Sequence, residues 1–117
     1  MIPMPIPGVS KEFIENILEG LAYTLIRQSV DKYNFIPSNS IECKVEDEQT
    51  VICWQFLQNC PRNINNFSFL LDEFSFIAKK VKQRHGYIFI SRVYLGKDAN
   101  TGMCYVLARS RWEPWGK

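Results

Sequence analysis

An apolar repeat with the spacing of an α-helix runs from Ser10 to about Lys32 and restricts what the rest of the chain can form. Ser10 is a suitable N-cap, and the carboxylates of Glu12 and Glu15 follow it at the positive end of the helix dipole. Apolar side chains then recur every three or four residues, which predicts one broad apolar face packed on a core. That face consists of Ile14, Ile17, Leu18, Leu21, Leu25 and Ile26.

The next two segments have the two-residue period of β-strands. Residues 41–46 alternate between apolar and charged side chains, which is typical of a strand with one buried face. Residues 50–57 are apolar on both faces, which favours a central strand. We therefore predict a hairpin with its turn at Asp47–Gln49.

The sequence alone does not decide between two registers for this hairpin. If Val45 pairs with Val51, then Cys43 pairs with Cys53, and the aromatic side chains of the second strand lie on the polar side of the first. A slip of one residue turns those aromatic side chains into the core instead. They are Trp54 and Phe56.

A second helix is predicted from about residue 66 to His85. Gly86 is suited to end it, because glycine accepts the left-handed conformation found after helix C-termini. Residues 87–95 and 103–112 then read as two strands joined by a loop at 96–102. The inner face of the second helix would carry Phe67, Leu70, Leu71, Phe74, Ile77, Ala78 and Val81.

These elements give the order α-β-β-α-β-β in a single α+β domain that spans residues 1–117. We expect a two-layer sandwich with a four-stranded, mainly antiparallel sheet and both helices on one face. The same order would result from a circular permutation of the ferredoxin-like arrangement. Residues 1–9 form a proline-rich lead-in and residues 113–117 a short tail.

Composition narrows the class of protein. Hydrophobic residues make up 46% of the chain and charged residues 22%, which is typical of a globular domain. No apolar run approaches the ~20 residues of a membrane-spanning helix, so we expect no membrane association. The first eight residues contain three prolines and no basic residue, which argues against a secretory signal and favours a cytoplasmic location.

The four cysteines contain no Cys-x-x-Cys pair, so their spacing does not favour structural zinc. In a cytoplasmic protein we expect four reduced thiols that pack as small apolar groups. A disulfide between Cys43 and Cys53 stays open if the compartment is oxidising. We expect neither a metal nor another cofactor.

Residue types that carry catalysis are scarce. His85 is the only histidine, which excludes paired-histidine metal sites and two-histidine nucleases. The segment Gly96–Gly102 lacks the Gly-Lys-Ser/Thr sequence of a phosphate-binding loop. We therefore expect a binding protein and not an enzyme.

Charge is divided unevenly along the chain. Residues 1–78 carry five basic and ten acidic residues, whereas residues 79–117 carry nine basic and two acidic residues. Arginines and tyrosines recur on the last two predicted strands, and they share one face only if the strands pair with an odd-residue offset. Such a surface suits either protein interfaces or unpaired bases and phosphates. The predicted binding residues are Lys79, Lys80, Lys82, Arg84, Arg92, Tyr94, Tyr105, Arg109, Arg111 and Trp112.

Two alternative functions are compatible with this predicted surface. The first is a protein-binding adaptor, inhibitor or complex subunit, including a homo-oligomer, because sixteen aromatic residues exceed what a small core needs. The uneven charge would also steer an oppositely charged partner. The alternative is binding of RNA or another single-stranded nucleic acid, which must weaken steeply with salt because neutralised phosphates release counterions.

Overall fold

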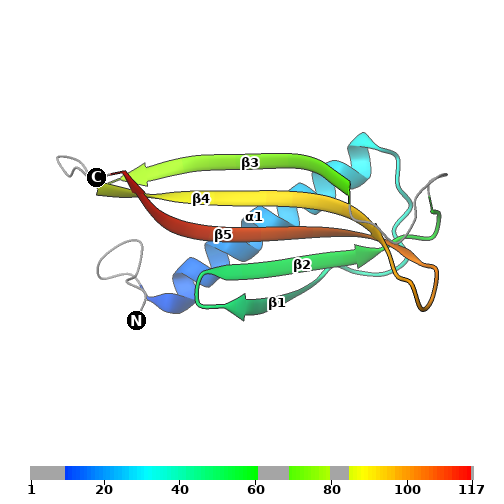
Figure 1. Ribbon diagram of the computed structural model, residues 1–117. Helices are drawn as coiled ribbons and strands as arrows, with labels where there is room; N and C mark the ends of the chain where they lie inside the picture. The colour runs from blue at the N-terminus through cyan, green and yellow to red at the C-terminus, as the bar shows by residue number, and fades with distance from the viewer. Residues whose placement is uncertain (1–9, 61–68, 80–84, 117) are drawn as a thin grey trace.

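A five-stranded antiparallel sheet carries one long helix on one of its faces (Figure 1). The computed structural model describes residues 10–60, 69–79 and 85–116, and the elements below are those of this part of the chain. The strands lie in the order β1-β2-β5-β4-β3, and each neighbour is antiparallel to the next. The elements are α1 (Lys11–Lys32), β1 (Glu42–Asp47), β2 (Thr50–Phe56), β3 (Phe69–Lys79), β4 (His85–Lys97) and β5 (Cys104–Gly116).

Helix α1 begins and ends where the sequence predicts. The side-chain oxygen of Ser10 accepts a hydrogen bond from the backbone N–H of Phe13 at 3.2 Å, as an N-cap does. The helix ends at Lys32, and Asn34 follows with a φ of 55°, a left-handed conformation that asparagine tolerates. The buried face consists of Ile14, Leu18, Ala22, Leu25, Ile26 and Ser29, which confirms most of the predicted stripe.

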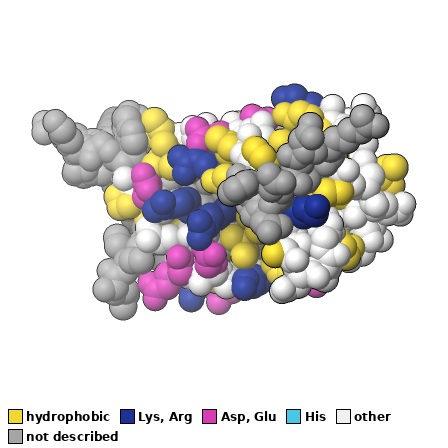
Figure 2. All heavy atoms as spheres, turned by 45° about the vertical axis from the view of Figure 1, so that its right-hand side comes forward, with side chains coloured by type: hydrophobic (Ala, Val, Ile, Leu, Met, Phe, Trp, Pro, Cys, Tyr) yellow, Lys and Arg dark blue, Asp and Glu magenta, His cyan; other side chains and the backbone are white. Residues whose placement is uncertain are grey.

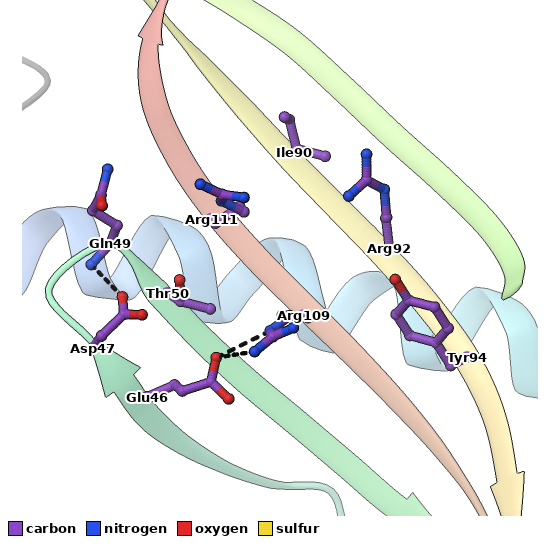
Figure 3. A pocket seen from close by; sticks show the side chains of 9 residues that line it. All are labelled: Glu46, Asp47, Gln49, Thr50, Ile90, Arg92, Tyr94, Arg109 and Arg111. Carbon is purple, nitrogen blue, oxygen red and sulfur yellow. Dashed lines mark hydrogen bonds and ion pairs between the residues drawn. The ribbon is translucent and has the colours of Figure 1, made fainter. Parts of the chain in front are cut away.

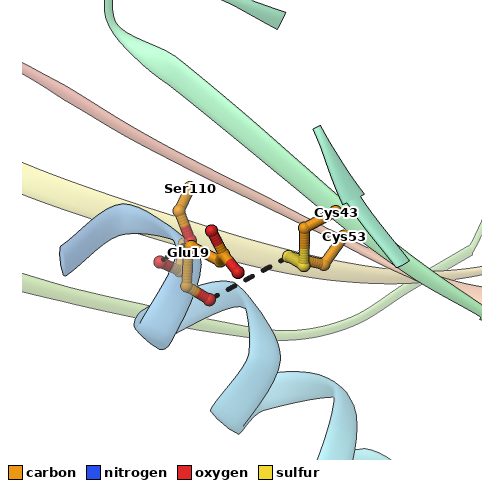
Figure 4. Close-up of a disulfide and its surroundings, with 5 residues drawn as sticks. Glu19, Cys43, Cys53 and Ser110 are labelled. Carbon is orange, nitrogen blue, oxygen red and sulfur yellow. Dashed lines mark hydrogen bonds between the residues drawn. A yellow bond between two sulfur atoms is a disulfide. The ribbon is translucent and has the colours of Figure 1, made fainter. Parts of the chain in front are cut away.

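Strands β1 and β2 pair in the register that joins the two cysteines. Val45 lies opposite Val51 and Cys43 opposite Cys53, and the cysteines form a disulfide. Figure 4 shows this disulfide beside α1, where the sulfur of Cys53 lies 3.9 Å from the backbone carbonyl oxygen of Glu19. Because Val51 and Cys53 are buried, the alternate residues of β2 lie on the face away from α1. These include Trp54 and Phe56.

Residues 69–79 form a strand, so the predicted second helix is wrong. The structure therefore also contradicts three predictions that depended on this helix: the four-stranded sheet, the two-helix layer of the sandwich and the permuted ferredoxin-like order. Strand β3 pairs with β4 from Phe69 opposite Leu95 to Lys79 opposite Gly86, and so satisfies backbone groups that β4 would otherwise leave free. Apolar residues of this segment recur at helical spacing and also alternate, so periodicity does not separate the two structures.

The last two strands extend beyond their predicted limits. Gly86 pairs within β4 and therefore does not end a helix. Strand β5 continues to Gly116, so most of the predicted tail at 113–117 belongs to the sheet. The lead-in at 1–9 lies outside the described residues. The helix in the described part of the chain is not long and apolar enough to cross a membrane.

Small side chains let α1 approach the middle of the sheet. Ala22 of the helix and Ala108 of β5 are completely buried, and so are two serines that lie opposite each other on β4 and β5. The hydroxyl groups of Ser91 and Ser110 are 2.6 Å apart and bond to each other, which satisfies both inside the core. Helix α1 lies across β2, β5 and β4 and has little contact with β3.

All four cysteines form disulfides, so the expectation of reduced thiols is wrong. In addition to the pair in β1 and β2, Cys60 bonds to Cys104 and ties the segment that follows β2 to the start of β5. The two bonds differ in the length of chain they close, with sequence separations of 10 and 44 residues. The longer loop restricts the unfolded chain more strongly.

We predict that the two disulfides contribute unequally to stability. Replacing Cys60 and Cys104 with alanine should lower the free energy of unfolding by about 4 kcal/mol, because a long loop gains more entropy when it opens. Replacing Cys43 and Cys53 with alanine should cost about 3 kcal/mol. Urea unfolding at 25 °C measures both, and a larger loss from the Cys43/Cys53 variant would contradict the prediction.

Candidate functional site

The face of the sheet opposite α1, here called the open face, holds the arginines that the sequence singles out. Phe89, Ser91 and Val93 of β4 are buried toward α1, so the residues between them project from the open face. Arg92 lies directly opposite Arg109 of β5, which is an odd-residue offset. The two strands therefore place their arginines and tyrosines on the same face, and this set is Arg92, Tyr94, Tyr105, Arg109 and Arg111.

Apolar and aromatic side chains, here called the aromatic area, occupy one end of the open face. The ring of Tyr105 stands edge-on to that of Phe56, with ring centroids 6.2 Å apart. Tyr105 also lies opposite Gly96 on β4, where an added Cβ would come within 2.5 Å of the ring. Glycine at this position thus lets the tyrosine ring lie across the neighbouring strand. The aromatic area consists of Ile52, Trp54, Phe56, Tyr94, Tyr105 and Leu107, all half-buried.

A carboxylate binds each of the three arginines, and the three carboxylates come from three different strands. Because Arg92 and Arg109 lie directly opposite each other, their like charges would repel without these partners. Glu73 raises the pKa of Arg92 above its ordinary value, first by accepting a hydrogen bond and second by its negative charge. The pairs are Arg92–Glu73, Arg109–Glu46 and Arg111–Glu113.

The ion pairs leave this part of the open face close to electroneutral. Their side chains are between 33% and 52% exposed, so each pair contributes at most about 1 kcal/mol to folding. Their main effect is positional: Nε of Arg109 donates to Oε1 of Glu46 at 3.0 Å, and Nη2 donates to the same oxygen. Figure 2 shows the consequence for the surface, where cationic side chains lie directly beside acidic ones.

A shallow hollow of about 260 Å³ lies between the arginines and the β1–β2 turn (Figure 3). The turn is held by a hydrogen bond from the backbone N–H of Gln49 to Oδ1 of Asp47 at 2.8 Å. The side-chain amide of Gln49 donates to the backbone carbonyl oxygen of Trp112 at 3.1 Å, which joins the turn to β5. Carboxylates, guanidinium groups and the hydroxyl of Tyr94 therefore surround the hollow with both donors and acceptors.

The other predicted binding residues do not join this group. Trp112 is only 1% exposed and packs edge-on against Tyr87, with ring centroids 5.7 Å apart, so its assignment to the surface is wrong. Lys79 is the last residue of β3 and not part of a helix end. The remaining predicted cations lie outside the described residues, and these are Lys80, Lys82 and Arg84.

Sequence reasoning missed the carboxylates and part of the aromatic area. The sequence places Glu46 at the end of a predicted strand, next to the turn, and Glu73 on the outer side of a predicted helix, so neither is matched to an arginine. Trp54 could be placed beside Tyr105 only after the hairpin register and the β2–β5 pairing are known. One feature of the sequence does point to the aromatic area: successive residues of β2 lie on alternate faces, so its two aromatic residues share one face.

No family model matches the chain, and neither a curated protein nor a solved structure matches it. In the part of the chain that the structure describes, no three His, Cys, Asp or Glu side chains are grouped so that they could hold a metal ion. Function must therefore be inferred from the chemistry of the open face.

We predict that Gly96 holds the aromatic area in place. Gly96→Ala should displace the ring of Tyr105 and lower the free energy of unfolding by about 1–3 kcal/mol, as overpacking does. Gly20→Ala is the matched control, because Gly20 is exposed in α1 with no atom near its Cβ position, and it should stabilise the protein by about 1 kcal/mol. Thermal unfolding and the ring signals of Tyr105 in NMR spectra report both effects, and an unmoved ring in the Gly96 variant would refute the prediction.

Proposed function

We propose that this protein is a non-catalytic protein-binding domain, an adaptor, inhibitor or subunit of a complex, whose open face docks a partner polypeptide. The observation that carries the proposal is the aromatic area lying next to neutralised arginines on a face that no second layer of described residues covers (Figure 1). Half-buried apolar side chains there lose their remaining contact with water when a partner covers them.

The chemistry of the arginines supports a polypeptide partner. A guanidinium group has five N–H donors, and a single carboxylate engages only some of them. Arg92 and Arg109 therefore keep donors for backbone carbonyl groups while their charges stay balanced. Tyrosine, tryptophan and arginine are the side chains that most often dominate the binding energy of protein interfaces.

The same ion pairs weigh against nucleic acid as the main ligand. A polyanion gains affinity by releasing counterions from phosphates that unpaired cations neutralise. On the open face each of the three arginines already has a carboxylate within ion-pair distance. A phosphate would have to displace that carboxylate and would meet its charge. Protein binding is thus the function that we infer, with nucleic acid as the alternative.

The disulfides support an oxidising compartment in place of the expected cytoplasmic location. Disulfides persist where glutathione and thioredoxin do not reduce them, and all four cysteines of this chain are paired. An oxidising compartment is also where a small binding domain gains most from covalent links between its strands.

We predict that a photo-crosslinking amino acid at Tyr105 captures a polypeptide in an extract of the source cells. The control site is Tyr23 on α1, which is also a tyrosine and 41% exposed but lies on the opposite side of the sheet. Capture at Tyr105 should disappear when Leu107→Lys places a charge in the aromatic area. Equal capture from both sites would contradict docking through the open face.

We predict further that the wild-type protein has no measurable affinity for single-stranded RNA at about 50 mM salt, whereas Glu46→Gln/Glu73→Gln binds it. The double variant frees two arginines, so its affinity should fall as salt rises, with a slope of about −0.7 for each phosphate neutralised. Fluorescence anisotropy with a labelled oligonucleotide measures this. Tight binding of RNA by the wild type would make nucleic-acid binding the favoured function and protein binding the alternative.

A further inference from the structure

Strand β3 is an edge of the sheet and carries unusually exposed apolar side chains. In the described chain it pairs on one side with β4, and its other side has no strand beside it. Phe74 is 47% exposed, Phe76 36% and Ile77 44%. An edge of this kind presents a row of backbone donors and acceptors together with apolar side chains, and so forms a template for a further strand.

The two edges of the sheet differ in their protection. Edge strand β1 has six residues, four of them charged, which discourages strand addition. Strand β3 has eleven residues, and its first half carries a bulge together with Asp72 and Glu73. Its second half, Phe74–Ala78, contains no charge, no proline and no bulge. As far as the described residues show, strand addition is therefore open at this half of β3 and discouraged at the other edge.

The exposed aromatic rings are held in place from within the chain. Phe76 stacks on the buried ring of Phe89 with centroids 4.9 Å apart, and Phe74 lies against Phe76 with centroids 5.9 Å apart. Both rings lie on the α1 side of β3, where the helix provides little cover. Side chains that are ordered before binding lose little entropy when a partner arrives.

We propose that a second copy of this chain pairs with β3 in antiparallel fashion, so that two sheets join into one across a two-fold axis at Ser75. In this register Phe74 of each copy lies opposite Phe76 of the other, on the α1 side of the joined sheet. Cross-strand aromatic pairs of this kind stabilise antiparallel strands. The axis at Ser75 also centres the contact on the unprotected half of β3.

Three features make a second copy of the chain a suitable partner for β3. Its own β3 has the required length of about 36 Å and no proline. The axis at Ser75 places Glu73 opposite Ile77 and Asp72 opposite Ala78 of the other copy, so like charges do not meet. The joined interface is isologous, which closes at two copies and does not propagate into fibres.

The expected dimer is weak. Three half-exposed apolar side chains of Phe74–Ala78 offer a few hundred Å² at most in each copy, since a whole aromatic side chain buries about 150–250 Å². Stable interfaces bury about 1,200–2,000 Å² in total, so backbone pairing must supply much of the remainder. We therefore expect a dissociation constant in the range of about 10 µM to 1 mM.

Sedimentation equilibrium and hydrogen exchange of the full chain test the proposal together. The mass should rise toward that of a dimer between about 10 µM and 1 mM, and the amides of Phe74–Ala78 should become protected over the same range. Phe74→Lys should weaken the dimer about tenfold or more, because two symmetry-related aromatic pairs are lost. Val45→Lys, at a 49% exposed position on the β1 edge, is the matched control and should leave the dimer unchanged.

Each outcome decides the proposal. A monomer at all concentrations would overturn it. A dimer would also overturn it if the β3 amides stayed unprotected, or if Phe74→Lys left the measured mass of the dimer unchanged. If Val45→Lys weakened the dimer as much as Phe74→Lys does, the contact between the two copies would not be specific to β3. Protection of β3 by a different protein, with this chain remaining monomeric, would assign the edge to that partner and not to self-pairing. Because Tyr105 lies on β5, two strands away from the outer edge of β3, failure here leaves the crosslinking result at Tyr105 unaffected.

Discussion

The close packing of α1 on the middle of the sheet determines which surfaces of this protein are left for partners. Completely buried small residues, Ala22 on the helix and Ala108 on β5, allow this approach. The helix covers one face only and crosses three of the five strands. Two sets of apolar side chains consequently stay partly exposed: the aromatic area on the open face, and the rings of Phe74 and Phe76 beyond the helix. Docking of a polypeptide would cover the first set, and pairing of β3 with a second copy would cover the second.

Electrostatics on the open face work through local pairing and not through accumulated charge. The excess of basic residues in the last third of the chain suggests a polycationic surface, yet Arg92, Arg109 and Arg111 meet carboxylates from β3, β1 and β5. Arg92 and Arg109 can lie side by side in the sheet because Glu73 and Glu46 offset their repulsion. A surface that is aromatic, rich in donors and nearly neutral suits a polypeptide better than a polyanion.

The two edges of the sheet are stabilised in different ways. Strand β1 is short and charged, and the disulfide between Cys43 and Cys53 links it covalently to β2. Strand β3 depends on its pairing with β4 and on the stack of Phe76 on Phe89. An association through β3 would add contacts at the edge that has less support within the chain.

The sequence by itself determined α1, because its cap and its apolar period agree, and it limited the β1–β2 hairpin to two registers. It also predicted that arginines and tyrosines of β4 and β5 would share a face under one condition, which the pairing of Arg92 with Arg109 meets. Only the tertiary structure decided the state of residues 69–79, whose apolar residues fit both periods. The free edge of β4 requires a neighbouring strand for its backbone groups, and that requirement exists only once the sheet has formed. The carboxylate partners of Arg92 and Arg109 depend in the same way on contacts between residues far apart in the chain. The same is true of the burial of Trp112 and of both disulfides.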